Sequence, residues 1–266
     1  MEGLLPQVNA TEGSVNPVLE ASMVTKAFSG RVALSTFSIS VHAGQVHGLL
    51  GSNGSGKSTA LHVMTGIIDP DHGVVLHEGI PVTRAAARSR FGLAPDDLPL
   101  PLALTGREYL GLHDSLRRRD DAARALEFAH VLDVRSALDK PMSSYSHGMK
   151  RKVQLICALM HRPSLLILDE PFRGLDPDTS EVLRSCIELF TGQGGAVLMA
   201  THDLLRAEAH CDQITMLHAG ETVVHGSTRE IVLEHGSLGR CFSEKTQRAS
   251  ARSTRDIRLR ALFAPR

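Results

Sequence analysis

One stretch of nine residues, Gly51–Thr59, constrains the fold of this chain more than any other feature. It fits the phosphate-binding loop pattern G-x-x-x-x-G-K-[ST], and it lies between a strand-like run at 45–50 and a helix-like run at 60–66. Glycines let the backbone curl so that consecutive N–H groups point toward an anion, and the next helix begins there with its positive end. We therefore expect a strand–loop–helix unit that binds a nucleoside triphosphate; the alternative is a Gly/Ser turn before a helix.

The side chains of this loop match the same chemistry. Lys57 can reach the β- and γ-phosphates, and the Ser58 hydroxyl can ligate Mg²⁺. The residues expected to bind the triphosphate are Gly51, Ser52, Asn53, Gly54, Ser55, Gly56, Lys57, Ser58 and Thr59.

Composition and charge argue against several other classes of protein. With 266 residues and 42% apolar content, the chain suits one large domain, or one domain with an inserted subdomain. Lys plus Arg and Asp plus Glu both number 29, and aromatic residues make up only 4%, so we expect no nucleic acid as partner. The four cysteines form no C-x-x-C pair and indicate a reduced, cytosolic protein. We expect no signal peptide and no membrane-spanning segment.

The order of strand-like and helix-like segments predicts an α/β fold, in which a P-loop NTPase core has a mostly parallel sheet, an antiparallel β subdomain and an inserted helical subdomain. Strand-like runs lie at 19–24, 32–42, 46–50, 73–77, 80–82, 165–168, 196–200, 214–217 and 222–225. Helix-like runs lie at 106–116, 122–132, 148–160, 177–190 and 203–210. Because strands and helices alternate after residue 161, the sheet should carry helices on both faces.

Two carboxylates, Asp169 and Glu170, directly follow the apolar run at 165–168. The C-terminal end of a buried strand is where α/β sheets hold ligands. Asp169 is placed to hold Mg²⁺, directly or through water, and Glu170 points differently and is placed to polarise an attacking water. The alternative is an ordinary Asp-Glu pair in a surface loop.

The motif Y-S-H-G-M before the last inserted helix resembles the L-S-G-G-Q signature of the ATP-binding cassette (ABC) family. Ser146 and Gly148 match that signature, whereas Tyr145, His147 and Met149 depart from it. A hydroxyl and free N–H groups at a helix start are suited to an anion, although such a Ser is often only a helix cap. The resemblance implies that the anion is the γ-phosphate held by an opposite subunit.

The order of the motifs is also that of the ABC family, over roughly residues 18–235. The resemblance implies that His202 contacts the γ-phosphate, and that Asp176 lies in the D-loop at a subunit interface. It also implies that Phe28 stacks on adenine, although a Phe at this position could equally be a core residue.

Asp96 stands where the family usually has a Gln that helps to hold Mg²⁺ and water. A carboxylate about 4 Å from a phosphate charge costs roughly 1 kcal/mol in water and up to about 4 kcal/mol at an effective dielectric of 20. We therefore expect Asp96 either to contact Mg²⁺ or to turn away from the nucleotide. The apolar run at 98–102 that follows offers contacts that a partner could cover.

The resemblance implies an ATP-binding and hydrolysing subunit of an ABC transporter of the export-type, ABC-2-like branch, with ATP and Mg²⁺ as cofactors. A second ATPase subunit, identical or not, would face it, and a separate membrane-spanning permease subunit would form the channel. These partners would place the chain in the cytoplasm, peripheral at the inner face of the cell membrane. The alternatives are a soluble ABC ATPase acting in assembly or repair, and a regulatory binder with slow hydrolysis.

The extent of the resemblance and the composition of the two ends set the expected domain boundaries. We expect a flexible leader at 1–17, the ABC ATPase domain at 18–235 with its helical subdomain at about 97–161, and a basic C-terminal extension at 236–266. Residues 240–266 hold eight Lys and Arg but only two acidic residues. Three interpretations of this tail stay open, namely a solvated extension, attraction to anionic lipid, and contact with nucleic acid.

Overall fold

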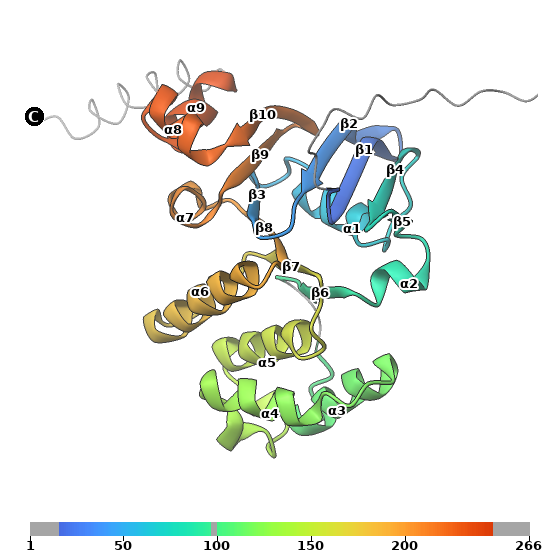
Figure 1. Ribbon diagram of the computed structural model, residues 1–266, viewed down its shortest axis with the longest axis vertical. Helices are drawn as coiled ribbons and strands as arrows, with labels where there is room; N and C mark the ends of the chain where they lie inside the picture. The colour runs from blue at the N-terminus through green and yellow to red at the C-terminus, as the bar shows by residue number, and fades with distance from the viewer. Residues whose placement is uncertain (1–15, 97–99, 247–266) are drawn as a thin grey trace, which may run out of the picture.

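The computed structural model describes residues 16–96 and 100–246. Two β-sheets lie together in the upper part of the view in Figure 1, and the helices of the inserted subdomain lie below them. Most of the expected leader, the first part of the apolar run at 98–102, and the basic tail beyond residue 246 lie outside the described residues. In the described part of the chain, no helix combines the length and apolarity that a membrane span requires.

A six-stranded sheet carries the site, with strand order β10-β9-β3-β8-β7-β6. Its strands are β3 (Val46–Gly51), β6 (Phe91–Ala94), β7 (Leu165–Asp169), β8 (Ala196–Thr201), β9 (Gln213–His218) and β10 (Glu221–Ser227). Only β10 runs antiparallel to its neighbour. Every residue of β3 and β8 is buried, as expected of continuous apolar strands that are covered on both faces. The predicted mostly parallel sheet is thus confirmed.

The predicted antiparallel β subdomain is a second sheet, with order β2-β1-β4-β5. Its strands are β1 (Leu19–Phe28), β2 (Arg31–Val41), β4 (His72–His77) and β5 (Ile80–Pro81). Between the runs expected at 73–77 and 80–82, Glu78 and Gly79 form a hairpin turn, and both have a positive φ, 49° and 76°. Such a pair of positive φ values matches the twist of the two flanking strands, which explains why a Gly follows the acidic residue here.

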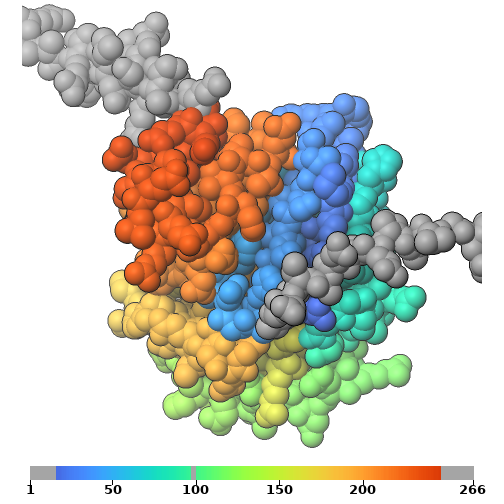
Figure 2. Space-filling model, turned by 45° about the horizontal axis from the view of Figure 1, so that its top comes forward, coloured from blue at the N-terminus to red at the C-terminus, as the bar shows by residue number. Residues whose placement is uncertain are grey.

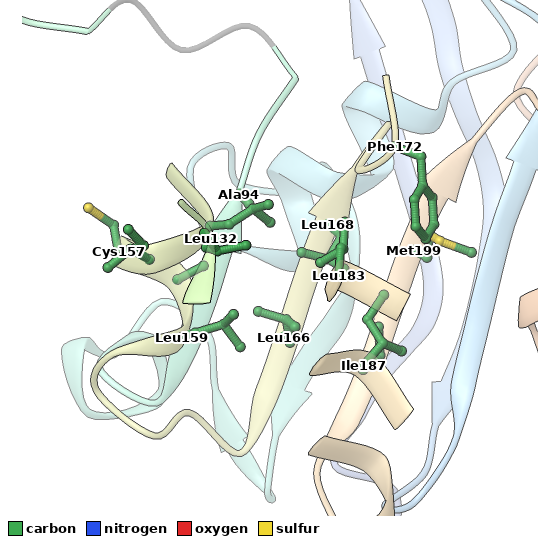
Figure 3. Close-up of a cluster of buried hydrophobic side chains, with 14 of the residues drawn as sticks. Ala94, Leu132, Cys157, Leu159, Leu166, Leu168, Phe172, Leu183, Ile187 and Met199 are labelled. Atoms are coloured by element: carbon green, nitrogen blue, oxygen red, sulfur yellow. The ribbon is translucent and has the colours of Figure 1, made fainter. Parts of the chain in front are cut away.

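Two hydrophobic clusters cover the two faces of the parallel sheet. Residues of β7 alternate between them, because successive side chains of a strand point to opposite faces. Leu165 and Ile167 pack with the antiparallel sheet and with α1 (Lys57–Met64), whereas Leu166 and Leu168 face the other way. Figure 3 shows Leu166 and Leu168 among side chains from α5 (His147–Leu159) and α6 (Pro177–Gly192). The parallel sheet therefore separates two hydrophobic cores.

The inserted helical subdomain consists of α3 (Gly106–Arg117), α4 (Ala122–Val131) and α5. Thr105 and Glu108 begin α3 with a capping box, in which each side chain accepts a hydrogen bond from the other residue's main-chain N–H. Tyr145 is buried just before α5, and its hydroxyl donates to the carbonyl of Ala137 at 2.7 Å. The Tyr that departs from the family signature therefore serves as a packing residue of this subdomain.

The structure continues past the domain boundary expected at residue 235. Besides α2 (Ala85–Arg88) and β6, the sequence patterns missed α8 (Thr228–His235) and α9 (Leu238–Lys245). Leu238, Cys241 and Phe242 of α9 are buried against neighbours that include α7 (Leu204–His210) and β10. In Figure 2 this C-terminal segment, in red, lies with strands β9 and β10 beside the antiparallel sheet, in blue. The first residues of the expected extension thus belong to the packed fold.

Candidate functional site

Three loops meet at the C-terminal ends of the parallel strands. β3, β7 and β8 are parallel neighbours, so their C-terminal ends lie side by side. In this register Asp169 pairs with Ala200, and Thr201 pairs with Leu50 just before the phosphate-binding loop. The fold therefore brings the loop, the Asp-Glu pair and His202 to a single place, although they are far apart in the sequence.

The phosphate-binding loop has a backbone that only glycine can adopt at two of its positions. Gly51 and Gly56 have φ values of 158° and 110°. A Cβ atom on Gly51 would lie 2.5 Å from the carbonyl oxygen of Leu217, and one on Gly56 would lie 2.7 Å from that of Ala33. Such contacts are shorter than real Cβ contacts, so any side chain here would force the loop out of shape.

Lys57 lies at the first position of α1 and folds back over this loop. Its Nζ donates to the carbonyl oxygens of Gly51 at 2.8 Å and Ser52 at 3.3 Å. Burial lowers the pKa of Lys57, while the carboxylates of Glu170 and Asp169 act in the opposite direction. A cation that is buried beside two carboxylates is well placed to exchange these two carbonyl contacts for an anionic ligand.

A pocket of about 620 Å³ lies beside the loop. Its lining comprises Arg31, Val32 and Ala33 of β2, Asn53, Gly54, Gly56, Lys57, Ser58 and Thr59 of the loop and α1, and Ala219 and Gly220. Phe28 pairs with Arg31 across the β1–β2 hairpin and therefore stands next to this lining. Phe28 is 45% exposed, and Nζ of Lys26 lies 5.6 Å from its ring centroid, so the alternative of a core Phe28 is wrong.

Glu170 is held in one orientation by the residues that follow β8. One carboxylate oxygen accepts the Thr201 hydroxyl at 2.8 Å, and the other accepts the main-chain N–H of His202 at 2.9 Å and lies 2.5 Å from Nδ1 of His202. The φ of Glu170 is 46°, which costs a non-glycine residue roughly 1 kcal/mol or more. The surrounding hydrogen bonds maintain this unfavourable conformation, which directs the carboxylate toward His202.

Asp169 lies at the end of β7 in a strongly negative environment. Burial raises the pKa of its carboxyl, and the carboxylates of Asp96 and Glu170 raise it further, against the effect of Arg151. Three carboxylates thus lie close together here, and Arg151 offsets their negative charge in part. The arrangement therefore suits a bound cation next to Asp169.

Asp96 is paired with a cation that the sequence analysis did not single out. Its Oδ2 lies 2.6 Å from Nη1 of Arg173, three residues after Glu170. The buried guanidinium of Arg151 donates to the carbonyl oxygens of Pro95 and Asp169, which holds the end of β6 against the end of β7. Asp96 thus contacts Arg173 while staying close enough to Asp169 to raise its pKa.

Ser146, Gly148 and Asp176 form a separate group. Ser146 begins α5 and accepts a hydrogen bond from the N–H of Met149 at 3.2 Å. Asp176 begins α6, and its carboxylate accepts the N–H and the hydroxyl of Thr179, both at 2.8 Å, which lowers its pKa. A Cβ atom on Gly148 would lie 3.4 Å from the carbonyl oxygen of Gly174, so the two helix starts adjoin each other. None of the three residues lines the pocket at the phosphate-binding loop.

Similarity to known proteins agrees with this geometry. A family profile described as "ABC transporter" matches residues 34–173. Nod factor export ATP-binding protein I of Sinorhizobium fredii (strain NBRC 101917 / NGR234) is 34% identical over 226 residues, which cover 81% of this chain and 64% of that protein. The linearmycin resistance ATP-binding protein LnrL of Bacillus subtilis (strain 168) is 31% identical over 224 residues, with coverages of 80% and 70%. This chain therefore spans only about two thirds of the length of such relatives.

Solved structures show the same fold. One described as the ATP binding subunit of an ABC transporter superposes with a TM-score of 0.81 at 28% identity, covering 86% of this chain and 99% of that chain. The structure of cbiO1 from Clostridium perfringens, part of the ABC transporter complex cbiONQ, gives a TM-score of 0.70 at 25% identity, with coverages of 83% and 92%. The chain belongs to the ABC transporter family, and its fold is that of an ATP-binding cassette.

Proposed function

We propose that this chain is the ATP-binding and ATP-hydrolysing subunit of an export-type ABC transporter. The observation that carries the proposal is the convergence of Lys57, Asp169, Glu170 and His202 at one edge of the parallel sheet. The relatives named for Nod factor export and linearmycin resistance support the export direction.

The residues beside the loop fit ATP together with Mg²⁺. The Ser58 hydroxyl and the Asp169 carboxylate are oxygen donors of the kind that Mg²⁺ prefers, and this ion commonly takes one or two protein ligands plus phosphate oxygens. Burial and the neighbouring carboxylates of Asp96 and Glu170 raise the pKa of Asp169, which supports a bound cation at this position. When bound, Mg²⁺ would neutralise charge that develops on the transferred phosphoryl group.

The chain's own groups then act on the triphosphate and on a water molecule. Lys57 exchanges its bonds to Gly51 and Ser52 for phosphate oxygens. Glu170 accepts a hydrogen bond from the attacking water and takes up its proton, because both of its oxygens are already oriented by Thr201 and His202. His202 contacts Glu170 through Nδ1, which leaves Nε2, on the other side of the ring, for the γ-phosphate; with a proton on both ring nitrogens the imidazolium would donate to that anion.

In this proposal one chain contributes one part to each of two ATP sites. Ser146 and Gly148 lie at the N-terminus of α5, where main-chain N–H groups and the helix dipole favour an anion. Since this group lies apart from the pocket lining, we infer that a second subunit faces this one head to tail. Each ATP would then lie between the loop of one subunit and Ser146 of the other, with Asp176 at their contact.

A separate membrane-spanning permease subunit is the second partner. Leu102, Leu112 and Leu116 are large apolar residues in and before α3, and 44% to 74% of their surface is exposed. They follow the Asp96 segment in the chain and offer apolar surface on the helical subdomain. Contact with such a permease would place the chain at the inner face of the cell membrane.

Copurification tests this assignment. The tagged chain, extracted with mild detergent from its native cells, should bring down a polytopic membrane protein in stoichiometric amount. A Leu112→Asp, Leu116→Asp variant should lose that partner yet keep its melting temperature, and Leu233→Asp, at another exposed position, serves as the matched control. Recovery of the chain only in soluble complexes would contradict the transporter assignment and favour a soluble ABC ATPase.

A further inference from the structure

A charged cluster surrounds the ends of β6 and β7. It comprises Asp96, Arg151, Asp169 and Arg173. Arg151 is 2% exposed and donates through both terminal nitrogens to main-chain carbonyl oxygens, those of Pro95 and Asp169. Its guanidinium therefore fixes the backbone at this position. The cation in direct contact with the Asp96 carboxylate is Arg173, at 2.6 Å.

The need for a counter-charge at Asp96 follows from the local charges. Arg151 joins the carbonyl oxygens of Pro95 and Asp169, so the carboxyl-bearing residues that follow them in the chain, Asp96 and Glu170, are brought together beside Asp169. A triphosphate in the loop would bring further negative charge to the same edge of the sheet. The Asp96 side chain is only 18% exposed, so water screens its charge incompletely.

We propose that Arg173 is a positioning residue that neutralises Asp96 and holds it against the segment between Glu170 and Asp176, so that this nucleotide site tolerates an acidic residue at position 96. The inference rests on the proposed function, since it concerns an ATP site. The pair also joins two parts of the site, because Asp96 leads into α3 whereas the N–H of Arg173 donates to the carbonyl of Glu170 at 3.0 Å.

An ordinary surface ion pair is the competing explanation. The Arg173 side chain is 62% exposed, and exposed pairs usually contribute little to stability. Such a pair would influence folding slightly and would not influence nucleotide affinity through Asp96. The two explanations therefore differ in whether the effect of removing Arg173 depends on the charge of residue 96.

A double-mutant cycle on the full chain separates them. The affinity for a fluorescent ATP analogue is measured in EDTA and in Mg²⁺ for the wild type, Arg173→Ala, Asp96→Asn and the double variant. Arg173→Ala should weaken binding roughly five- to tenfold in EDTA, and less in Mg²⁺, because it leaves Asp96 unpaired beside the phosphates. In the Asp96→Asn background the same substitution should change affinity less than twofold.

Two further variants act as controls. Arg173→Lys retains the charge and should bind the analogue nearly as the wild type does. Arg107→Ala breaks another Arg–Asp pair, with Asp139 at 2.7 Å in the helical subdomain, and should leave affinity unchanged. Melting temperatures identify any variant that fails to fold. If Arg173→Ala is such a variant, the affinities of Arg173→Lys and Asp96→Asn decide between the two explanations.

Equal loss of affinity from Arg173→Ala in both backgrounds, or no loss in either, would overturn the inference. So would tight binding by Arg173→Ala alone in EDTA, or weak binding by a folded Arg173→Lys variant. If the wild-type chain itself binds no ATP analogue, the proposed function fails instead, and that outcome is recognised before any variant is compared.

Discussion

Glu170 and His202 are joined twice, because one carboxylate oxygen of Glu170 accepts the main-chain N–H of His202 at 2.9 Å and lies 2.5 Å from its ring Nδ1. The first contact fixes the backbone after β8 relative to β7, and the second fixes the plane of the imidazole. The two residues expected to act on the water and on the γ-phosphate are therefore oriented as a unit.

Replacing His202 should therefore impair chemistry more than binding. A His202→Ala variant should lose about 100-fold in kcat while its affinity for ATP changes little. The substitution removes a group that orients Glu170 and contacts the γ-phosphate in the transition state. Steady-state ATPase assays and equilibrium titration measure the two quantities. His130→Ala, at an exposed position on α4, should behave as the wild type; equal losses in affinity and kcat for His202→Ala would contradict the assigned role.

Replacing Lys57 should have the opposite pattern. Lys57→Ala removes a charged donor to the phosphates, which is worth about 1.5–3 kcal/mol, so ATP affinity should fall roughly 10- to 100-fold. Isothermal titration with ATP measures this loss, and Lys140→Ala, far along the chain in an exposed position, is the control. Unchanged affinity in a folded Lys57→Ala protein would show that the loop does not bind the triphosphate.

The core beneath the site should be sensitive to cavities. Leu166 is 1% exposed on β7, between α5 and α6, and its truncation to Ala should lower the free energy of unfolding by about 2–5 kcal/mol. Leu205→Ala, at a residue that is 79% exposed, should change it by less than about 0.5 kcal/mol. Denaturant titration compares the two, and a similar small effect at both positions would contradict the packing described.

Acidification should destabilise the fold through buried histidines. Burial lowers the pKa of His47 from 6.5 to about 3, so the unfolded chain binds a proton near pH 6.5 that the folded chain refuses. Stability from this group is complete above pH 6.5 and is lost as the pH falls toward 3, by roughly 2 kcal/mol between pH 6.5 and 5. His47→Gln should therefore show a shallower decline in unfolding free energy over that range. An identical slope in wild type and variant would refute the assignment.

Local sequence patterns predicted the elements whose own residues specify them. The apolar runs of β3, β7 and β8 and the loop Gly51–Thr59 carry their signals within a few residues, and the structure confirms those strands and their parallel order. The short strand β6 and helices α8 and α9 lack strong local signals, although Leu238, Cys241 and Phe242 do follow a helical spacing that was overlooked among charged residues.

Contacts between distant segments were beyond such patterns. The sequence identified Asp96 as a departure from the Gln that is usual in the family. Its partner Arg173 lies 77 residues away, and nothing near either residue indicates the pairing. Likewise, the hydroxyl of Thr201 orients Glu170 only because β7 and β8 are neighbours in the sheet. These contacts depend on tertiary structure and not on local sequence.

The most direct test of the account concerns Glu170. A Glu170→Gln variant keeps the shape of the side chain but cannot take up the proton of the attacking water. Its ATPase turnover should fall at least about 100-fold, and with ATP it should accumulate as a dimer in size-exclusion chromatography with light scattering. Glu234→Gln, at an exposed position on α8, controls for the substitution itself. Wild-type turnover by Glu170→Gln would contradict the central claim that Glu170 activates water in an ATP site shared by two subunits.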